Sequence, residues 1–308
     1  MASESLGSPL RAFGRVSVYG LFTLLLIPVQ GLFVLLGWPA QTSFPVWYHR
    51  RCCRLLGFRV VRRGKPAQEG PVLFVSNHCS YLDITVLGSL VPASFVAKTE
   101  VGQWPLFGAL AKLQRSVFVD RQSIRAGTQR DEMSARLEAG DNLILFPEGT
   151  SSDGNRVLPF KRSLLAVAEL APGGRPLTVQ PVSIAYTMLD GLPMGRYLRP
   201  FFAWYGDMDL VSHLWQWAGL GRLTVVVRFH EPVTLARFGS RKVLSDHCQA
   251  VVSRGLSEAL AGRRLVRRAR METALGPEVG QLVAGKLTEV RERPVQAPGA
   301  SPGKGPPA

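Results

Sequence analysis

Residues 72–83 read VLFVSNHCSYLD, an apolar run that gives way to a short polar loop. The first part, Val72–Ser76, is rich in bulky and β-branched residues and predicts a buried strand. The apolar spacing that begins at Leu82 predicts a helix over Leu82–Leu90. The polar side chains between the two therefore lie in a loop at the end of a strand, directly before a helix.

The segments that follow this unit alternate in the same way. Short apolar runs separated by longer mixed segments indicate an α/β domain, which we place at residues 57–262. Further strands are expected at Ser94–Lys98, Ser116–Asp120, Asn142–Phe146, Leu177–Ser183 and Leu223–Phe229. Further helices are expected at Ser123–Glu138, Arg162–Leu170 and Ser240–Ala261, with Ser240 as an N-cap.

An N-terminal stretch, Val16–Trp38, carries no charged side chain and is long enough to cross a bilayer as a helix of about 20 residues. Because Pro28 interrupts it, a kinked span and a helical hairpin lying in one leaflet both fit the pattern. A buried helix of a soluble domain is the plainer alternative. Basic residues concentrated at positions 50–65 favour a cytoplasmic main body held against anionic lipid headgroups. We therefore expect a membrane anchor over residues 1–50.

The whole chain of 308 residues has 37 Lys and Arg against 22 Asp and Glu, a net charge of +15. This balance points to an anionic partner, such as nucleic acid, lipid headgroups or a phosphorylated substrate. The four cysteines form no Cys-x-x-Cys pair, which argues against a metal cluster and against a disulfide-bonded secreted domain. Residues 263–308 begin with a basic run and become rich in Pro, Gly and Ala, so we expect a disordered tail.

His78 and Asp83 stand at the two ends of the polar loop. Histidine is the side chain best suited to remove a proton near neutral pH, and an aspartate can hold its ring in the tautomer that leaves Nε2 as an acceptor. The two side chains can meet if His78 lies in the loop and Asp83 in the first helical turn. The plainer interpretation is a histidine at a helix start and an ordinary aspartate in the first turn.

A second polar loop reads PEGTSSDG at residues 147–154. Its turn at Gly149 and Thr150 exposes backbone N–H groups that can hold an oxyanion, and Lys161 adds positive charge nearby. Glu148 is out of place in an anion-binding loop, which indicates a role in positioning a substrate hydroxyl or a basic side chain. A solvated surface loop is the plainer interpretation.

Arg121 follows the predicted strand Ser116–Asp120. At the end of a strand, its guanidinium can clamp a phosphate through two N–H groups. A structural ion pair with Asp120 is an equally good interpretation of this residue taken alone.

Together, the motifs and their order resemble the glycerolipid acyltransferase family, best known from lysophosphatidic acid acyltransferases. The matching motifs are Asn77-His78-x4-Asp83, Phe118-x2-Arg121, Phe146-Pro147-Glu148-Gly149-Thr150 and Val179-x-Pro181-Val182. The resemblance covers residues 72–186 and implies the glycerol-phosphate acyltransferase fold, a mixed α/β sheet flanked by helices. It implies that His78 is the general base and Asp83 its orienting partner. It further implies an acceptor site formed by Asn77, Arg121, Glu148, Gly149, Thr150 and Lys161.

The resemblance implies a membrane-bound O-acyltransferase at a bacterial-type inner membrane, with its catalytic domain facing the cytoplasm. Such an enzyme transfers a fatty acyl group from acyl-CoA or acyl carrier protein to 1-acyl-sn-glycerol 3-phosphate, giving phosphatidic acid, and we expect no metal and no bound cofactor. Its other partners are membrane lipids.

Ser151 stands where many lysophosphatidate-specific members have Arg, which indicates an alternative acceptor, a lyso-ornithine lipid. A third hypothesis is a non-enzymatic basic protein that binds membrane surfaces. The sequence carries no zinc-finger, RNA-binding or helix-turn-helix signature, so we do not expect a nucleic-acid partner.

Overall fold

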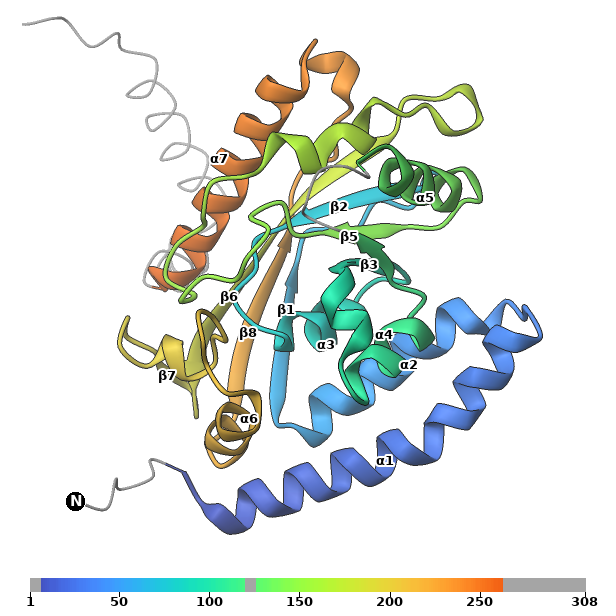
Figure 1. Ribbon diagram of the computed structural model, residues 1–308. Coiled ribbons are helices and arrows are strands. Elements are labelled where there is room, and N and C mark those ends of the chain that lie inside the picture. Colours follow the sequence, from blue (N-terminus) through green and yellow to red (C-terminus); the bar gives the residue numbers. More distant parts are fainter. Residues whose placement is uncertain (1–6, 120–125, 263–308) are drawn as a thin grey trace, which may run out of the picture. The chain divides into compact units, whose positions relative to one another are not determined.

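The computed structural model describes residues 7–119 and 126–262, with only the backbone described at 126–131 (Figure 1). Its centre is a mixed sheet in the order β1-β8-β6-β2-β5-β3-β4, with β7 paired to β6. Adjacent strands are parallel except in the pairs β6–β8 and β6–β7. The strands are β1 (Phe58–Arg63), β2 (Val72–Ser76), β3 (Ser94–Lys98), β4 (Val117–Val119), β5 (Leu143–Leu145), β6 (Thr178–Leu189), β7 (Leu192–Pro193) and β8 (Leu223–Phe229).

The central strand β2 is buried along its whole length. Because side chains alternate along a strand, Phe74 joins one apolar core while Leu73 and Val75 join another on the opposite face of the sheet. A strand covered on both faces needs apolar residues at successive positions. This explains the unbroken apolar run that precedes the loop with His78.

Helices cover the two faces of the sheet. The helices are α1 (Pro9–Leu35), α2 (Ala40–Leu55), α3 (Leu82–Gly88), α4 (Phe107–Leu113), α5 (Ala126–Glu138), α6 (Leu210–Ala218) and α7 (Arg241–Leu260). α7 joins the core around Leu73 through Leu244 and Val252. α3 and α6 join the core around Phe74 on the other face, through Val86 and Trp217 (Figure 1).

α1 and α2 form a helical hairpin, and α1 is bonded to the rest of the domain at both ends. Near its start, Arg15 donates to the carbonyl of Leu220 at 2.7 Å, and near its end Gln30 donates to the carbonyl of Leu113 at 2.9 Å. In the described part of the chain, α1 is the one helix long and apolar enough to span a membrane, with a mean hydropathy of 2.1. Only 11% of that stretch is buried, so most of its apolar surface faces outward.

The predicted strands at 72–76, 94–98 and 223–229 have the observed bounds, and the others differ at their ends. The predicted strand 177–183 extends to Leu189, because it pairs with β8 along its second half. The predicted helix 162–170 is instead a 3-10 helix, η2 (Arg162–Glu169).

The elements that were not expected from the sequence include β1, α2 and α4. β1 contains three arginines and resembles a charged run, although it is an edge strand, where charged side chains are tolerated and discourage pairing with another chain. α2 continues to Leu55, beyond the expected end of the anchor at residue 50. The expected tail, residues 263–308, lies outside the described residues.

Candidate active site

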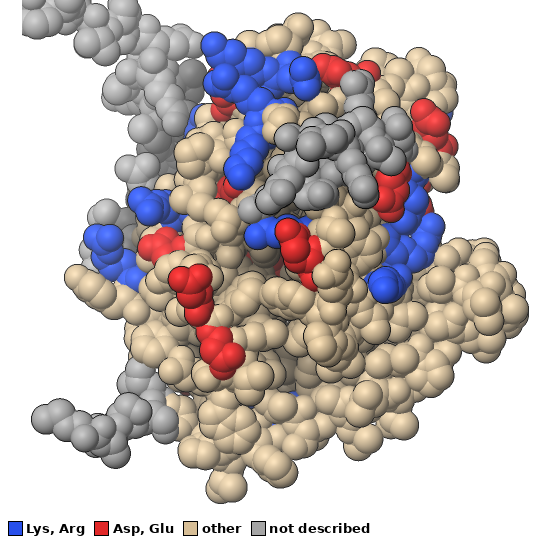
Figure 2. Space-filling view, viewed as in Figure 1, with Lys and Arg blue, Asp and Glu red and all other residues tan. Residues whose placement is uncertain are grey.

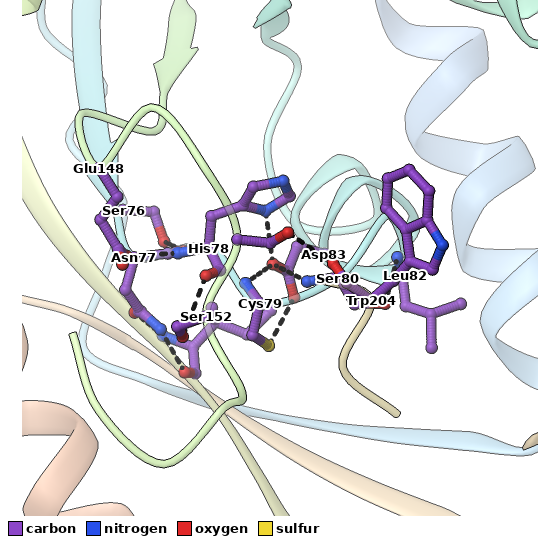
Figure 3. A network of polar contacts seen from close by, with 12 residues as sticks. Ser76, Asn77, His78, Cys79, Ser80, Leu82, Asp83, Glu148, Ser152 and Trp204 are labelled. Carbon is purple, nitrogen blue, oxygen red and sulfur yellow. Dashed lines mark hydrogen bonds and ion pairs between the residues drawn. The ribbon is translucent and has the colours of Figure 1, made fainter. Parts of the chain in front are cut away.

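The strand–loop–helix unit brings His78 and Asp83 together at the end of β2. Ser76 ends β2, Leu82 begins α3, and Asp83 lies in the first turn of that helix. His78 Nδ1 lies 2.8 Å from Asp83 Oδ2 (Figure 3). On one continuous helix, residues five positions apart point in different directions, so the contact depends on the loop between the two elements.

Asp83 is fully buried, and several donors hold its carboxylate in place. Oδ2 accepts hydrogen bonds from the N–H groups of Cys79 at 2.8 Å and Ser80 at 3.1 Å, beside His78. Oδ1 accepts the hydroxyl of Tyr186 at 2.6 Å. Burial raises the pKa of Tyr186, so this hydroxyl keeps the proton that it donates. The carboxylate that meets His78 is therefore fixed in orientation.

The same network assigns the tautomer of His78. An ionised carboxylate can only accept hydrogen bonds, so Nδ1 carries the hydrogen and Nε2 carries the lone pair. Among the described residues no hydrogen-bond partner lies at Nε2. This atom can therefore take a proton from a bound group.

The ring of His78 lines a cavity of about 600 Å³. One face of the ring stacks on Phe146, with centroids 4.1 Å apart and planes 20° apart, and the side chain is 23% exposed. The rest of the cavity wall is mostly apolar and comes from α1, α2, α3, β3, α4 and the segment around Trp204. The base thus lies where a polar loop meets a space suited to a hydrocarbon chain.

Two of the predicted acceptor ligands, Glu148 and Asn77, lie behind His78 and do not line the cavity. Glu148 accepts the N–H of His78 at 2.8 Å and that of Leu158 at 2.7 Å. Burial raises the pKa of Glu148 to about 8, although the hydrogen bonds from the two backbone N–H groups act to lower it. The side-chain amide of Asn77 donates from Nδ2 to the carbonyl of Ile184 at 3.0 Å, and its Oδ1 accepts the N–H of Ile184 at 2.9 Å. In this structure both side chains hold the loop of His78 in place.

The predicted oxyanion turn lies at the cavity, where Gly149, Thr150 and Ser151 contribute to the wall. Gly149 has a φ of +69°, and a Cβ at this position would lie 3.1 Å from Lys161 Nζ. The lysine side chain therefore lies against the turn, although Lys161 itself is not among the residues that line the cavity. The expected phosphate clamp, Arg121, lies outside the described residues.

Tyr186 and Trp204 belong to the site although no catalytic or binding role was predicted for either residue. The backbone N–H of Trp204 donates to the carbonyl of Cys79 at 2.8 Å, and its backbone carbonyl accepts the hydroxyl of Ser151 at 2.5 Å, so Trp204 joins the two polar loops. The one local signal for Tyr186 is a hydroxyl within a buried strand, because a buried tyrosine needs a hydrogen-bond partner. That signal does not say which residue the partner is.

Comparison with known proteins identifies the family. A family model described as Acyltransferase matches residues 57–185, the segment that contains the site. A lyso-ornithine lipid O-acyltransferase of Brucella abortus is 45% identical over 263 residues, which are 83% of this chain and 97% of the relative. The chain belongs to the acyltransferase family. A second relative of this acyltransferase, a lyso-ornithine lipid O-acyltransferase of Rhizobium meliloti, is 43% identical over 81% of this chain and 88% of its own length.

A solved structure has the same fold as this acyltransferase. The crystal structure of a 1-acyl-sn-glycerophosphate acyltransferase from Thermotoga maritima matches with a TM-score of 0.60 and 24% identity, over 81% of this chain and 96% of that one. The predicted mixed sheet flanked by helices is therefore confirmed. A 1-acyl-sn-glycerol-3-phosphate acyltransferase of Neisseria gonorrhoeae is 33% identical over 59% of this chain and 69% of its own length.

These relationships decide the class of function. The acyltransferase is an enzyme of lipid metabolism and works with a lipid acceptor and an acyl donor. The hypothesis of a non-enzymatic membrane-surface binder is wrong.

Proposed function

We propose that this acyltransferase moves a fatty acyl group from an acyl thioester, carried by CoA or acyl carrier protein, to the free hydroxyl of a lyso-ornithine lipid. The His78–Asp83 pair carries the chemistry, because its Nε2 faces a mostly apolar cavity. The choice of a lyso-ornithine lipid is supported by two relatives named for this acceptor, each more than 40% identical over at least 81% of the chain. The lysophosphatidate acceptor, which the sequence motifs favour, becomes the second candidate.

The reaction follows from the geometry of the pair. The acceptor hydroxyl attacks the thioester carbonyl while His78 Nε2 takes its proton, and Asp83 stabilises the imidazolium that forms. The tetrahedral intermediate then collapses as the C–S bond breaks, and the thiolate leaves with the proton held by His78. A new C–O ester bond replaces the thioester, and the imidazole returns to its first state. No acyl-enzyme intermediate is needed, because the thioester is already activated.

The apolar cavity is proposed to hold an acyl chain. It begins at His78 and continues between α1, α2 and α4, so a thioester carbonyl placed at the ring leads its hydrocarbon chain away from the polar loops. Burial of each methylene group favours binding by about 0.8 kcal/mol. A long chain therefore gains several kcal/mol by lying there.

We place the acceptor headgroup at the turn of Gly149 and Thr150. A lyso-ornithine lipid carries a carboxylate and an ammonium group and no phosphate. Lys161, which lies against the turn, suits the carboxylate, and Glu100, exposed on the same cavity, suits the ammonium. Ser151, at the position where an Arg is common in lysophosphatidate-specific members, bonds Trp204 and adds no charge.

Membrane attachment is proposed to occur through the outward face of α1, with the catalytic domain at the cytoplasmic face of the inner membrane. Leu21, Leu24 and Leu25 are 60–64% exposed, and the lower part of Figure 2, over α1, is largely free of charged side chains. A helix of 27 residues is about 40 Å long, so a span would carry its ends to opposite sides of a bilayer. Because both ends bond the same domain, we infer that the hairpin lies in one leaflet.

The second candidate acceptor is 1-acyl-sn-glycerol 3-phosphate. It is supported by the Neisseria gonorrhoeae relative named for this acceptor and by the positive charge of Lys161 at the turn. Both candidates use the same base and the same acyl donor, so an acceptor comparison separates them.

The experiment offers membranes containing the full chain a radiolabelled acyl thioester with lyso-ornithine lipid, and with lysophosphatidate in a parallel arm. We expect labelled ornithine lipid from the wild type, and no product above background from His78→Ala. His247→Ala is the matched control, because this histidine lies on α7 and does not line the cavity. Transfer by His78→Ala at a near-normal rate contradicts the role of His78, and phosphatidic acid as the only product contradicts the proposed acceptor.

A further inference from the structure

α6 has one buried face and one exposed face. His213 and Trp217 are four positions apart, so they share a face of the helix, and both are buried. Val211 and Trp215 share another face and are 72% and 46% exposed. The helix contains no Lys, Arg, Asp or Glu, so its exposed face is uncharged. An exposed apolar helix face indicates a contact outside the domain.

The buried face of α6 is bonded to the active-site loop. The hydroxyl of Tyr81, at the end of the loop between β2 and α3, accepts the Nε1 hydrogen of Trp217 at 2.8 Å and lies 3.0 Å from His213 Nδ1. Tyr81 also lines the cavity, as does Leu210, the first residue of α6. α6 therefore connects an exposed apolar face with the loop that carries the proposed base.

α6 lies beside the start of α1, the helix proposed to enter the membrane. The N–H of Ser8, directly before α1, donates to the carbonyl of Gly219, directly after α6, at 3.0 Å. Ala12 of α1 and Trp217 of α6 belong to the same apolar core (Figure 1). Figure 2 shows that this edge of the domain is largely free of charged side chains. Two apolar helix surfaces therefore lie next to each other.

A bilayer is the partner that best suits the exposed face of α6. Leu10 and Phe13 near the start of α1 are exposed, so apolar side chains of both helices lie at this edge. Tryptophan is enriched at the interface between bilayer and water, because its ring combines an apolar body with an N–H group. Arg11 Nη1 donates to the carbonyl of Gly219 at 3.4 Å, so a positive charge that suits anionic headgroups lies where the two helices meet.

We propose that the outer face of α6, formed by Val211 and Trp215, is a second membrane-contact surface and lies in the same leaflet as α1. A helix with one apolar face rests at the level of the headgroups, with that face toward the acyl chains. Because the buried face bonds Tyr81, this contact also holds the active-site loop in a fixed position relative to the lipids. The inference rests on the proposed function, in that α1 attaches the domain to a membrane. A second copy of the chain on this face is the competing explanation.

The test places an environment-sensitive fluorophore on this face in the full chain. Val211→Cys is labelled with nitrobenzoxadiazole and reconstituted into vesicles of phosphatidylcholine and phosphatidylglycerol, with or without lipids whose acyl chains carry a doxyl quencher. The four native cysteines are buried, so the label goes to the introduced thiol. Leu24→Cys on α1 is the positive control. Val243→Cys is the matched control, because Val243 is a 48% exposed valine on α7, which covers the other face of the sheet.

We expect the doxyl lipids to quench the label at position 211 nearly as strongly as at position 24, and about fivefold more than at position 243. Addition of Trp215→Ser should reduce the quenching at position 211 about twofold or more, because it removes apolar area from the contact, and should leave position 24 unchanged. Trp215→Cys, labelled in the same way, provides a second reporter if Val211→Cys does not fold.

Quenching at position 24 without quenching at position 211 overturns the contact of α6 and leaves the attachment through α1 intact. Equal quenching at positions 211 and 243 overturns it too, since the lipids then do not distinguish this face. Energy transfer between labelled copies, with no quenching at position 211, overturns it and identifies a second copy as the occupant. Absence of quenching at position 24 contradicts the attachment through α1 and, with it, the shared leaflet.

Discussion

The hydroxyl of Tyr186 on β6 lies 2.6 Å from Asp83 Oδ1, although 103 positions separate the two residues in the chain. β6 pairs with β2, the strand that leads into the loop of His78. The sheet therefore brings a donor from a neighbouring strand to the far side of the carboxylate that orients His78. Through this contact the register of β2 and β6 determines the geometry of the proposed base.

Removal of this donor should slow the reaction more than it weakens substrate binding. We expect Tyr186→Phe to lower kcat about 3- to 10-fold with little change in KM, because Asp83 keeps its other bonds but loses one restraint. The control is Tyr197→Phe, at a residue that is 85% exposed. Steady-state kinetics in mixed micelles provide both constants. An unchanged kcat would show that Tyr186 serves stability alone.

Replacement of Asp83 tests the tautomer assignment. In Asp83→Asn the amide can donate to His78 Nδ1, which moves the imidazole hydrogen to Nε2 and removes the proton acceptor from the cavity. We expect kcat to fall about 100-fold or more. Asp246→Asn is the matched control, because Asp246 forms only an exposed ion pair with Arg162 among the described contacts. A kcat within a few-fold of wild type, measured on folded protein, contradicts the orienting role.

The stability of the protein should depend on pH through Glu148. Burial raises the pKa of Glu148 from 4.5 to about 8, so between these values the folded protein holds a proton that the unfolded chain has lost. The stabilisation is fully present below about pH 4.5 and is lost as the pH rises through about 8.

The variant Glu148→Gln cannot ionise and isolates this effect. Relative to the variant, the free energy of unfolding of the wild type should fall between about pH 5 and about pH 9. Urea unfolding of both proteins at several pH values measures the difference. A difference that stays constant, or that rises with pH, is inconsistent with a buried carboxyl group that resists ionisation.

The turn at Gly149 offers a matched pair of glycines. Gly149 and Gly140 have φ values of +69° and +86°, so an alanine at either position should destabilise the protein by about 1–2 kcal/mol. Only Gly149 lines the cavity and lies against Lys161, whereas a Cβ at Gly140 meets nothing within 4 Å. We therefore expect Gly149→Ala to raise the acceptor KM about tenfold and Gly140→Ala to leave it unchanged. Equal effects of both changes on KM would remove the turn from the acceptor site.

The sequence predicts the central part of the fold because its signals are local. The apolar run of β2, the polar loop after it and the helix start are encoded within residues 72–83, so the His78–Asp83 contact follows from short-range patterns. The loop at 147–154 is likewise recognisable from its turn residues, and the structure places Gly149 and Thr150 at the cavity.

Contacts between distant segments could not be predicted in the same way. The Tyr186–Asp83 bond depends on the register of β6 against β2, which no local pattern encodes. Glu148 resembles a substrate ligand in sequence, but its two oxygens bond backbone groups of residues 78 and 158. β1 resembled a charged run because three of its six residues are arginines, and its parallel pairing with β8 decides its conformation.

Competition between the two acceptors in one reaction tests the proposed acceptor and the proposed base together. Equimolar lyso-ornithine lipid and lysophosphatidate, incorporated in the same vesicles, are offered to the wild-type enzyme with one labelled acyl thioester, and the two products are separated and counted. We predict that ornithine lipid carries most of the label and that both products disappear in His78→Ala. A predominance of labelled phosphatidic acid would contradict the proposed acceptor, and label that persists in the variant would contradict the proposed base.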